Sequence, residues 1–465
     1  MDLGASRGRV VTGVLRDGCL SIEVVHRFEH AAQPAGGRKR WDFELINREI
    51  DRGLFAAAER AGGGEIASLS CDSWAQDFGL VDEAGRLAYA PVCYRDSRTQ
   101  GMPGILAKTL PPGEIFRQNG STLSPITTLC QLAAMVRDEP EVLHRPVTLL
   151  FVADLIHSRL CGSRVTDATF ATASQLRSLR HDGWNREILL KLGIPQGVLP
   201  PVLKAPAVIG RVRAEAAPHP RLIGVPVIAG AGHDTAAASA AIPSLGDGTL
   251  FLILGTWAML GCCLGAEPQE RHLTDDSLAL LGLPWRRWGL FAGCTGMWPL
   301  QECLREWSTG GLDLGYEALE LAAQKFPSEI AVDLGAPRFF APSRMTEAIA
   351  TACRESGLSV PAAPGEFTAL ILRSLAWGIA GNTRRLAAVT GRDFTLLRLV
   401  GGGSRSGMLC RRLAANLGFP VLAGPAEATA IGNILVQART LGVLRGENET
   451  AEVLERSFAP LMVEA

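Results

Sequence analysis

The chain has 465 residues, of which 47% are hydrophobic and 20% charged, and its net charge at pH 7 is −1. This length is too great for one compact core, so we expect a globular protein with two domains of similar size. A near-neutral charge without long runs of Lys or Arg argues against nucleic acid or an anionic membrane as the main partner.

The cysteines predict a reducing compartment. There are 11 of them, an odd number, and no two have CxxC spacing. This pattern favours free thiols in a cytoplasmic protein over a disulfide framework or a zinc site. Residues 248–266 carry no charge and have the length of a membrane span. However, Gly255-Thr256-Trp257 interrupts this stretch and β-formers dominate it, so we expect two buried strands joined by a turn.

In the first half of the chain, strands and helices alternate. Residues 10–15 and 20–25 flank an Asp17-Gly18 turn, which predicts a hairpin. Apolar residues at helical spacing predict a helix over 42–60. Further strands are expected at 66–71, 78–81, 86–90 and 226–229, and further helices at 125–137, 147–160 and 185–192.

The second half follows a similar order and opens on a hairpin at 248–254 and 258–264. A strand is expected at 396–400, and helices at 297–307, 312–324, 346–356, 366–390, 406–417 and 427–441. Alternating strands and helices with interspersed hairpins make the fold class α/β. Asp2–Ser6 and Ile253–Trp257 form a weak internal repeat, because each places Gly and a small or hydroxyl residue at a turn between strands.

Three glycine-rich turns could bind phosphate, since their backbone N–H groups are unshielded. They lie at residues 4–8, 254–256 and 401–403. None is a Walker loop or has GxGxxG spacing. Each alone could be structural, but together they favour a nucleoside triphosphate.

One aspartate follows an apolar strand and opens a helix. Asp234 directly follows the glycine-rich segment Gly230-Ala231-Gly232-His233. At this position it could be a helix N-cap or a catalytic group. Phosphoryl transfer needs positioned phosphates, Mg²⁺ and a base for the incoming hydroxyl. Asp2 is suited to bind the metal ion, and Asp234 is suited to act as the base. We expect the helix start to lower the pKa of Asp234 and keep it ionised.

A further set of polar residues could bind a sugar. Alternatively, these residues could cap loops and form surface ion pairs. The members of the set are Asp72, Asp77, Asp96, Arg95 and Arg98. Trp74 could stack on a sugar face or fill the core. His233 could contact the ligand or serve only as a turn residue.

Eight segments then match a known family. They read DLGASRGR at 2–9, CDSWAQDFGLVDEAGRL at 71–87, YRDSRT at 94–99, AGHDTA at 231–236, LGTWAMLG at 254–261, GMWPLQE at 296–302, VGGGSR at 400–405 and AGPAEATAIGN at 423–433. In order and spacing the chain resembles the FGGY carbohydrate kinases, and within them the L-rhamnulokinases, over nearly its whole length. The resemblance implies two ribonuclease-H-like domains of the actin/hexokinase type, with an active-site cleft between them. The expected boundaries are 1–240 for sugar binding and the catalytic Asp, 241–440 for ATP binding, and 441–465 for a tail packed back on both.

The resemblance also implies roles for single residues. Asp234 would be the catalytic base and would touch the sugar together with His233. The ATP contacts would be Ala5, Ser6, Arg7, Gly8, Arg9, Thr256, Gln301 and Gly402, with Gly255, Gly401 and Gly403 beside them. The cofactors would be ATP and Mg²⁺.

The chain also departs from the family. Other members carry several more residues before the first phosphate motif, so we expect a shortened first strand or a start upstream of Met1. On the sugar side, Trp-Gly-Val-Asp is Trp74-Ala75-Gln76-Asp77, a common Asn falls at Gly293, and Phe-Asn-Thr is Ile126-Thr127-Thr128. Losing one partner of a sugar hydroxyl costs about 1–3 kcal/mol, which is enough to change sugar preference.

We therefore expect an ATP-dependent kinase of a ketose or deoxy-ketose resembling L-rhamnulose. A non-catalytic sugar- or nucleotide-binding relative and an actin-like ATPase are the alternatives. The expected partner is a small-molecule sugar, without nucleic acid or membrane, and a homodimer remains open.

Overall fold

The computed structural model describes residues 1–243, 245–265, 268, 272–326, 330–340 and 342–465. These residues form two compact units, and neither unit is one continuous stretch of chain. The first unit comprises Met1–Ser244, Leu264–Gly289 and Ala428–Ser457, and the second comprises Leu245–Cys263, Leu290–Glu427 and Phe458–Ala465.

The first unit is built around short strands whose ends carry the acidic residues singled out above. One sheet has the order β3-β2-β1-β7, and a second has the order β13-β14-β6. Their strands are β1 (Asp2–Leu3), β2 (Arg7–Arg16), β3 (Cys19–Glu29), β6 (Leu69–Ser70), β7 (Asp72–Ser73), β13 (Ala207–Arg211) and β14 (Pro226–Ala229). β1 runs antiparallel to β2 and parallel to β7. A bridge between Ser73 and His233 brings the segment after β14 to the end of β7.

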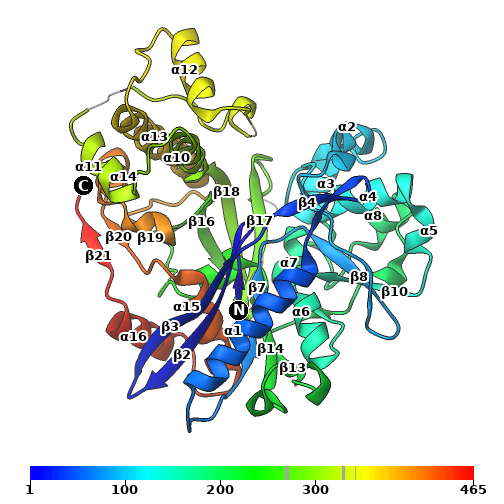
Figure 1. Cartoon of the computed structure of the whole chain (residues 1–465). Helices are drawn as coiled ribbons and strands as arrows, with labels where there is room; N and C mark the ends of the chain where they lie inside the picture. Colours follow the sequence, from blue (N-terminus) through cyan, green and yellow to red (C-terminus); the bar gives the residue numbers. More distant parts are fainter. Residues whose placement is uncertain (244, 266–267, 269–271, 327–329, 341) are drawn as a thin grey trace. The chain divides into compact units, whose positions relative to one another are not determined.

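The long β2–β3 hairpin forms where the sequence predicts it. Asp17 and Gly18 have φ values of 53° and 71°, the left-handed pair that matches the twist of a two-residue hairpin. Helix α1 (Phe43–Arg60) lies along this hairpin (Figure 1). The helix begins after Asp42, whose side chain accepts a hydrogen bond of 2.9 Å from the amide of Leu45.

The remaining elements of the first unit surround these sheets. A third sheet has the order β10-β8-β9, formed by β10 (Val147–Phe151), β8 (Phe78–Asp82) and β9 (Leu87–Tyr89). The other strands are β4 (Ala32–Ala35), β5 (Arg38–Trp41), β11 (Thr166–Asp167), β12 (Val202–Leu203) and β17 (Leu278–Leu283). The other helices are α2 (Met102–Leu106), α3 (Pro112–Asn119), α4 (Thr128–Asp138), α5 (Pro140–Leu143), α6 (Val152–Cys161), α7 (Ala168–Ala173), α8 (Arg186–Lys191), α9 (Asp234–Ser239), α15 (Ala428–Thr440) and α16 (Glu447–Ser457).

Two sequence-based predictions are wrong here. The helix predicted over 147–160 is strand β10 followed by α6, because Val147–Phe151 pairs along its whole length with β8. The strand predicted over 66–71 contains only Leu69–Ser70, which pairs with β14, and the next two-residue strand, Asp72–Ser73, pairs with β1 in a different sheet.

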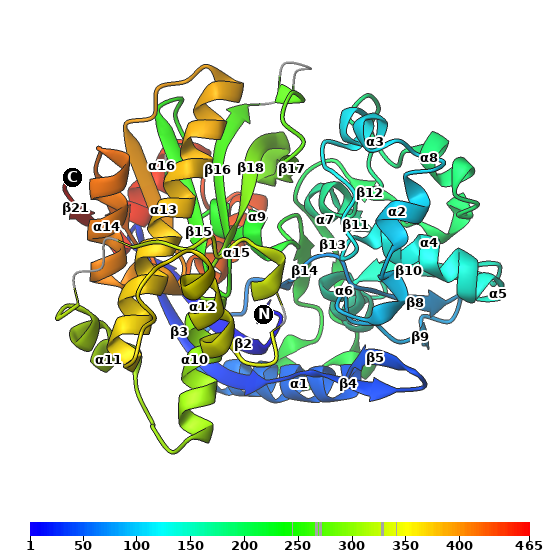
Figure 2. The ribbon, with the colours of Figure 1, turned by 90° about the horizontal axis from the view of Figure 1, so that it is seen from above.

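The second unit repeats the plan of the first around a longer central strand. β15 (Thr249–Leu254) pairs antiparallel with β16 (Trp257–Gly265) and parallel with β19 (Leu396–Val400). β18 (Arg287–Thr295) continues the sheet beyond β16, and β20 (Val421–Ala423) and β21 (Leu461–Val463) continue it beyond β19. The helices are α10 (Trp298–Thr309), α11 (Tyr316–Ala323), α12 (Met345–Glu355), α13 (Pro364–Thr390) and α14 (Gly407–Leu417). Figure 2 shows α10, α12 and α13 gathered together.

The weak internal repeat in the sequence therefore has a structural counterpart. In each unit a turn joins the central strand to its antiparallel neighbour: residues 4–6 between β1 and β2, and residues 255–256 between β15 and β16. The repeated order of antiparallel and parallel strands confirms the predicted α/β fold class.

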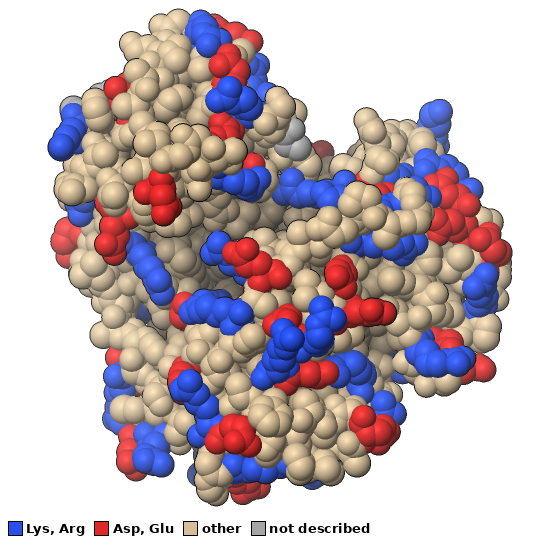
Figure 3. Space-filling view, viewed as in Figure 1, with Lys and Arg blue, Asp and Glu red and all other residues tan. Residues whose placement is uncertain are grey.

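Acidic and basic side chains are interspersed on the face shown in Figure 3. All eleven cysteines carry free thiols. Within the described part of the chain, no helix is both long and apolar enough to cross a membrane.

Candidate active site

The turn at residues 230–234 is held by three hydrogen bonds to distant segments. The amide of Gly232 donates to Oδ2 of Asp167 at 2.7 Å, and the amide of Ser73 donates to the carbonyl of Gly232 at 2.8 Å. The amide of His233 donates to Oγ1 of Thr169 at 3.1 Å. A Cβ on Gly232 would overlap the ring of Phe170, so only glycine permits this close approach. The turn therefore presents Asp234, the first residue of α9, from a fixed backbone.

Asp234 has a perturbed carboxyl group. Its Oδ1 accepts a 2.6 Å hydrogen bond from the amide of Thr235, and its side chain is 33% exposed. Removal from water, reinforced by the negative charge of Asp2, raises the pKa of Asp234 to about 7. The prediction that the helix start lowers this pKa is wrong, because α9 has only six residues and the Thr235 bonds do not outweigh burial.

His233 lies beside this carboxyl group as a neutral ring. Its Nε2 is 3.4 Å from Oδ1 of Asp234, and burial lowers the pKa of the imidazole to about 4. At neutral pH the pair is therefore a contact between a carboxyl group and an uncharged imidazole, without ion pairing.

Two more carboxylates lie on adjacent strands. Asp2 and Asp72 are direct partners in the parallel β1–β7 pairing. Asp2 is ion-paired with Arg9, whose Nε is 2.8 Å from Oδ2. Asp72 is completely buried, accepts a 2.6 Å bond from Nδ2 of Asn433, and has no hydrogen-bond partner at Oδ1. Burial, together with the charge of Asp2, raises the pKa of Asp72 well above its ordinary value.

The first glycine-rich turn predicted to bind phosphate, at residues 4–8, is open toward solvent at its tip. The amide of Gly4 bonds to the carbonyl of Arg7 at 2.9 Å, and Ala5 and Ser6 lie between them. Ser6 and Arg7 are exposed, and Arg7 forms a surface ion pair with Glu29. The turn is closed by its own backbone hydrogen bond, and the hydroxyl of Ser6 and the ion-paired guanidinium of Arg7 are exposed to solvent. Beyond the turn, Gly8 is buried under the ring of Phe28, so it supports the strand.

On the proposed sugar side, Trp74 and Asp77 face the protein interior. The fully buried carboxylate of Asp77 accepts hydrogen bonds from Nε1 of Trp41 at 2.6 Å, Nε1 of Trp74 at 3.0 Å and Nε2 of Gln131 at 3.0 Å. Burial raises the pKa of Asp77 to about 6. This geometry favours the core role for Trp74, and a sugar contact by either residue stays a prediction.

Two of the segments at which the sequence departs from the family that it resembles touch each other. Gln76, which follows Ala75, has a φ of 82°, a strained value for a residue with a side chain. Oγ1 of Thr128 donates to the carbonyl of Gln76 at 2.9 Å, and the amide of Thr128 donates to its Oε1 at 3.2 Å. The segments 75–76 and 126–128 are therefore in direct contact.

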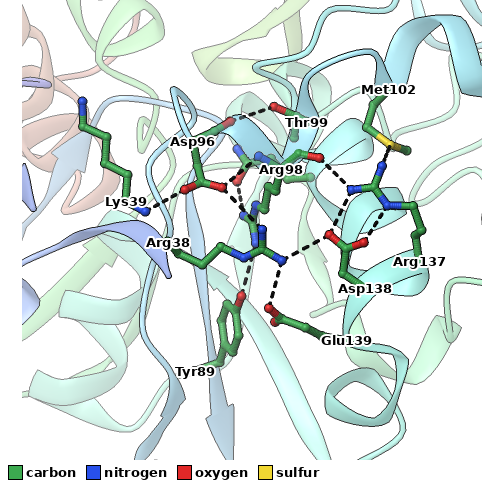
Figure 4. A network of polar contacts seen from close by, with 11 residues as sticks. Arg38, Lys39, Tyr89, Asp96, Arg98, Thr99, Met102, Arg137, Asp138 and Glu139 are labelled. Carbon is green, nitrogen blue, oxygen red and sulfur yellow. Dashed lines mark hydrogen bonds and ion pairs between the residues drawn. The ribbon is translucent and has the colours of Figure 1, made fainter. Parts of the chain in front are cut away.

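Asp96 and Arg98 belong to a network of polar contacts (Figure 4). Asp96 accepts bonds from the amides of Lys39 at 2.6 Å and Arg98 at 3.0 Å. The buried guanidinium of Arg98 donates to Oε1 of Gln131 at 2.6 Å. These contacts support the capping alternative for Asp96. Arg95 is half-buried, with Nε 3.4 Å from the hydroxyl of Tyr94.

In the second unit, the other two glycine-rich turns predicted to bind phosphate lie side by side. Gly401 has a φ of 88°, and a Cβ there would lie 2.7 Å from the carbonyl oxygen of Leu254, just before Gly255. Gly403 likewise packs on the side chain of Leu254. Gly402 is exposed, and no described atom would lie within 4 Å of its Cβ. The first and third glycines therefore fix the loop, and the middle one is free to approach a ligand.

The 255–256 turn also rests on the start of α10. The amide of Met297 donates to the carbonyl of Gly255 at 2.9 Å, and the amide of Trp298 donates to that of Thr256 at 3.2 Å. Gln301 is half-buried one turn further along this helix. Gly293, on β18, is exposed, and among described residues nothing lies within 4 Å of the place of its missing Cβ.

The sequence did not reveal Asp167 or Asn433 as supports of this site. Asp167 also caps α7, because its Oδ1 accepts a 2.8 Å hydrogen bond from the amide of Thr169. The Asp-Ala-Thr sequence could therefore have indicated the helix cap, but not the contact with Gly232. Asn433 ends the AGPAEATAIGN segment, but its contact with Asp72 had no local signal, since 361 positions separate the two residues.

Comparison with known proteins identifies relatives over the whole chain. The profile of the FGGY family of carbohydrate kinases, N-terminal domain, matches residues 1–240, and that of the C-terminal domain matches residues 250–441. Rhamnulokinase from Klebsiella pneumoniae (strain 342) is 33% identical over 466 aligned residues, covering 99% of this chain and 92% of the relative. Rhamnulokinase from Bacteroides thetaiotaomicron is 31% identical, covering 98% of this chain and 93% of the relative.

Solved structures share the fold at lower identity. Glycerol kinase from Plasmodium falciparum with ADP has a TM-score of 0.80 at 13% identity, covering 99% of this chain and 92% of the other. Xylulose kinase from Rhodospirillum rubrum has a TM-score of 0.77 at 18% identity, covering 100% of this chain and 93% of the other. The fold is thus the two-domain, actin/hexokinase-like ATPase fold.

Proposed function

Because the chain belongs to the FGGY family of carbohydrate kinases and is therefore a sugar kinase, we propose that it transfers the γ-phosphoryl group of ATP to a hydroxyl of a ketose or deoxy-ketose. Relatives named rhamnulokinase favour a sugar resembling L-rhamnulose. The departures at Ala75, Gly293 and 126–128 favour a preference different from theirs.

Asp234 is the general base in this proposal. The supporting observation is its position on the rigid 230–234 turn with a pKa of about 7, which suits a group that accepts a proton near neutral pH. The sugar hydroxyl oxygen forms the new bond to the γ-phosphorus while its proton passes to a carboxylate oxygen of Asp234. The bond from the γ-phosphorus to the β,γ-bridging oxygen breaks, and ADP leaves with that electron pair. His233, neutral beside Asp234, would bind a sugar hydroxyl without competing for this proton.

The phosphates of ATP would be bound by backbone amides and short polar side chains. The 4–6 turn offers the hydroxyl of Ser6 and the guanidinium of Arg7, and Gly402 offers an unshielded amide. Thr256 lies in the turn after Leu254, against which Gly401 and Gly403 pack, and Gln301 lies on the helix that is hydrogen-bonded to this turn.

A magnesium ion carried by the nucleotide needs few protein ligands, and the candidate is Asp2, whose Oδ2 also pairs with Arg9. Among the described residues no group of three or more His, Cys, Asp or Glu side chains could hold a metal. Mg²⁺ is typically bound by one or two carboxylates, with water and phosphate completing its shell. Asp2 would hold this ion, and the bound ion would neutralise part of the negative charge of the phosphates.

The test is coupled ADP release with Mg-ATP against L-rhamnulose, L-fuculose, L-ribulose and D-xylulose. The proposal expects turnover that depends on one or a few of these sugars. ADP release that is independent of sugar would instead support an ATPase. Binding of sugar or nucleotide without turnover would support the non-catalytic alternative, which the complete set of phosphate turns and Asp234 disfavours.

A further inference from the structure

Helix α15 contacts two elements that carry carboxylates of the candidate site, through the neighbouring residues Gly432 and Asn433. Both residues are buried in the first unit. They fall at the end of the AGPAEATAIGN segment, to which the proposed function assigns no role.

Gly432 allows α15 to lie directly on α9. A Cβ at this position would overlap the carbonyl oxygen of Ala237 and would lie 2.9 Å from its carbonyl carbon and 3.1 Å from the amide nitrogen of Ala241. These are backbone atoms, so a side chain at residue 432 could be accommodated only if α9 and α15 moved apart. Ala237 is three residues after Asp234 on the same six-residue helix. A displacement of α9 would therefore displace Asp234.

Asn433 holds Asp72 through a hydrogen-bonded chain with a defined direction. The hydroxyl of Ser68 donates to Oε1 of Gln437 at 2.8 Å, and Nε2 of Gln437 donates to Oδ1 of Asn433 at 2.9 Å. This leaves Nδ2 of Asn433 to donate to Oδ2 of Asp72 at 2.6 Å. Asp72 in turn is the strand partner of Asp2, and the adjacent Ser73 is bridged to His233.

We infer that Gly432 and Asn433 are positioning residues for phosphoryl transfer: Gly432 fixes Asp234 through α9, and Asn433 fixes the strand end at Asp72. This inference rests on the proposed function of Asp234 as the base. Small displacements at such a site are costly, since an error of about 1 Å in the placement of a reacting group can lower the rate about 100-fold.

The experiment compares Gly432→Ala and Asn433→Leu with Val436→Ala. Val436 lies on the same helix, is buried, and packs against Ala237 and Ala240, so its truncation loosens α15 without adding a Cβ or removing the polar chain. The inference expects kcat to fall by about tenfold to 100-fold in the first two variants. It expects KM for ATP to remain within about threefold of wild type, since the lost interaction acts on the chemical step. Val436→Ala is expected to lower Tm while keeping kcat within about twofold of wild type.

The outcomes separate the inference from the function on which it rests. If Gly432→Ala does not fold, the inference is tested by comparing Asn433→Leu with Val436→Ala. Equal kcat in Asn433→Leu and Val436→Ala at matched Tm would overturn the inference while leaving the kinase intact. A wild-type protein without sugar-dependent turnover would overturn the proposed function and this inference with it.

Discussion

The amide of Gly232 donates a 2.7 Å hydrogen bond to Oδ2 of Asp167, which precedes it by 65 positions in the chain. The other oxygen of Asp167 accepts from the amides of Thr169 and Phe170 at the start of α7. One buried carboxylate thus joins a helix start to the turn that presents Asp234. The backbone before the proposed base is fixed from outside its own strand and helix.

We predict that Asp167→Ala lowers both stability and kcat. Leaving the buried amide of Gly232 without an acceptor costs about 1–3 kcal/mol, and loss of the α7 cap adds about 1 kcal/mol. Displacement of Asp234 is expected to lower kcat about tenfold or more. Urea unfolding and steady-state kinetics measure the two effects. The control is Asp42→Ala, which removes an exposed cap of α1 and is expected to cost about 1 kcal/mol without changing kcat. Equal kcat values in the two variants would contradict the role given to Asp167.

The pKa of Asp234 predicts the acidic side of the pH profile. The base must be ionised to accept the hydroxyl proton, and a pKa of about 7 leaves it half protonated at pH 7. We therefore expect kcat/KM of the free enzyme to rise with pH and level off above about pH 8. A profile of kcat/KM between pH 5 and 9 at constant ionic strength tests this. An acidic limb near pH 4 would indicate a fully solvated carboxylate and contradict the raised pKa of the partly buried Asp234.

The same pKa predicts how stability varies with pH. The folded-state value of about 7 lies above the ordinary value of 3.8, so the folded protein binds this proton more tightly than the unfolded chain. The resulting stability is fully present below about pH 4 and is lost as pH rises toward 7. Asp234→Asn cannot ionise, so its Tm should exceed that of wild type at pH 8, with a smaller difference at pH 5. A Tm below wild type at pH 8 would contradict this prediction.

Gly293 offers a direct test of sugar preference. The family pattern that the sequence resembles implies Asn at this position, and a Cβ at residue 293 would meet no described atom within 4 Å. We expect Gly293→Asn to fold normally and to raise kcat/KM for L-rhamnulose relative to other ketoses by about tenfold, the value of one added hydrogen bond. Gly378→Ala, at another open position, is the control and should leave the ratio unchanged. An unchanged ratio in Gly293→Asn would remove residue 293 from the sugar site.

Much of the fold could be predicted because its signals are local. The Asp17-Gly18 turn, the cap at Asp42 and the apolar run at 396–400 each specify an element within a few residues. The prediction failed at 147–160, where Val147–Phe151 is too short and too apolar for periodicity to separate a strand from a helix. Its pairing with β8, about 70 positions earlier, decides the outcome.

The candidate site was only partly predictable for a related reason. Asp234 and the glycine turns are marked by strand ends and glycine spacing, which sequence shows. The partners that hold them, such as Asp167 for Gly232 and Asn433 for Asp72, are brought together by tertiary packing. The sign of the pKa shift at Asp234 also depended on burial and on Asp2, neither of which the local helix start reveals.

The most direct test of the central claim is the rate of sugar-dependent ADP release by wild type and Asp234→Asn, each at saturating Mg-ATP and ketose. Our account predicts that the variant remains folded and binds ATP, while kcat falls by about 10²–10⁴-fold, the usual contribution of a general base. A variant with the kcat of the wild type would show that Asp234 is not the base and would contradict the proposed mechanism.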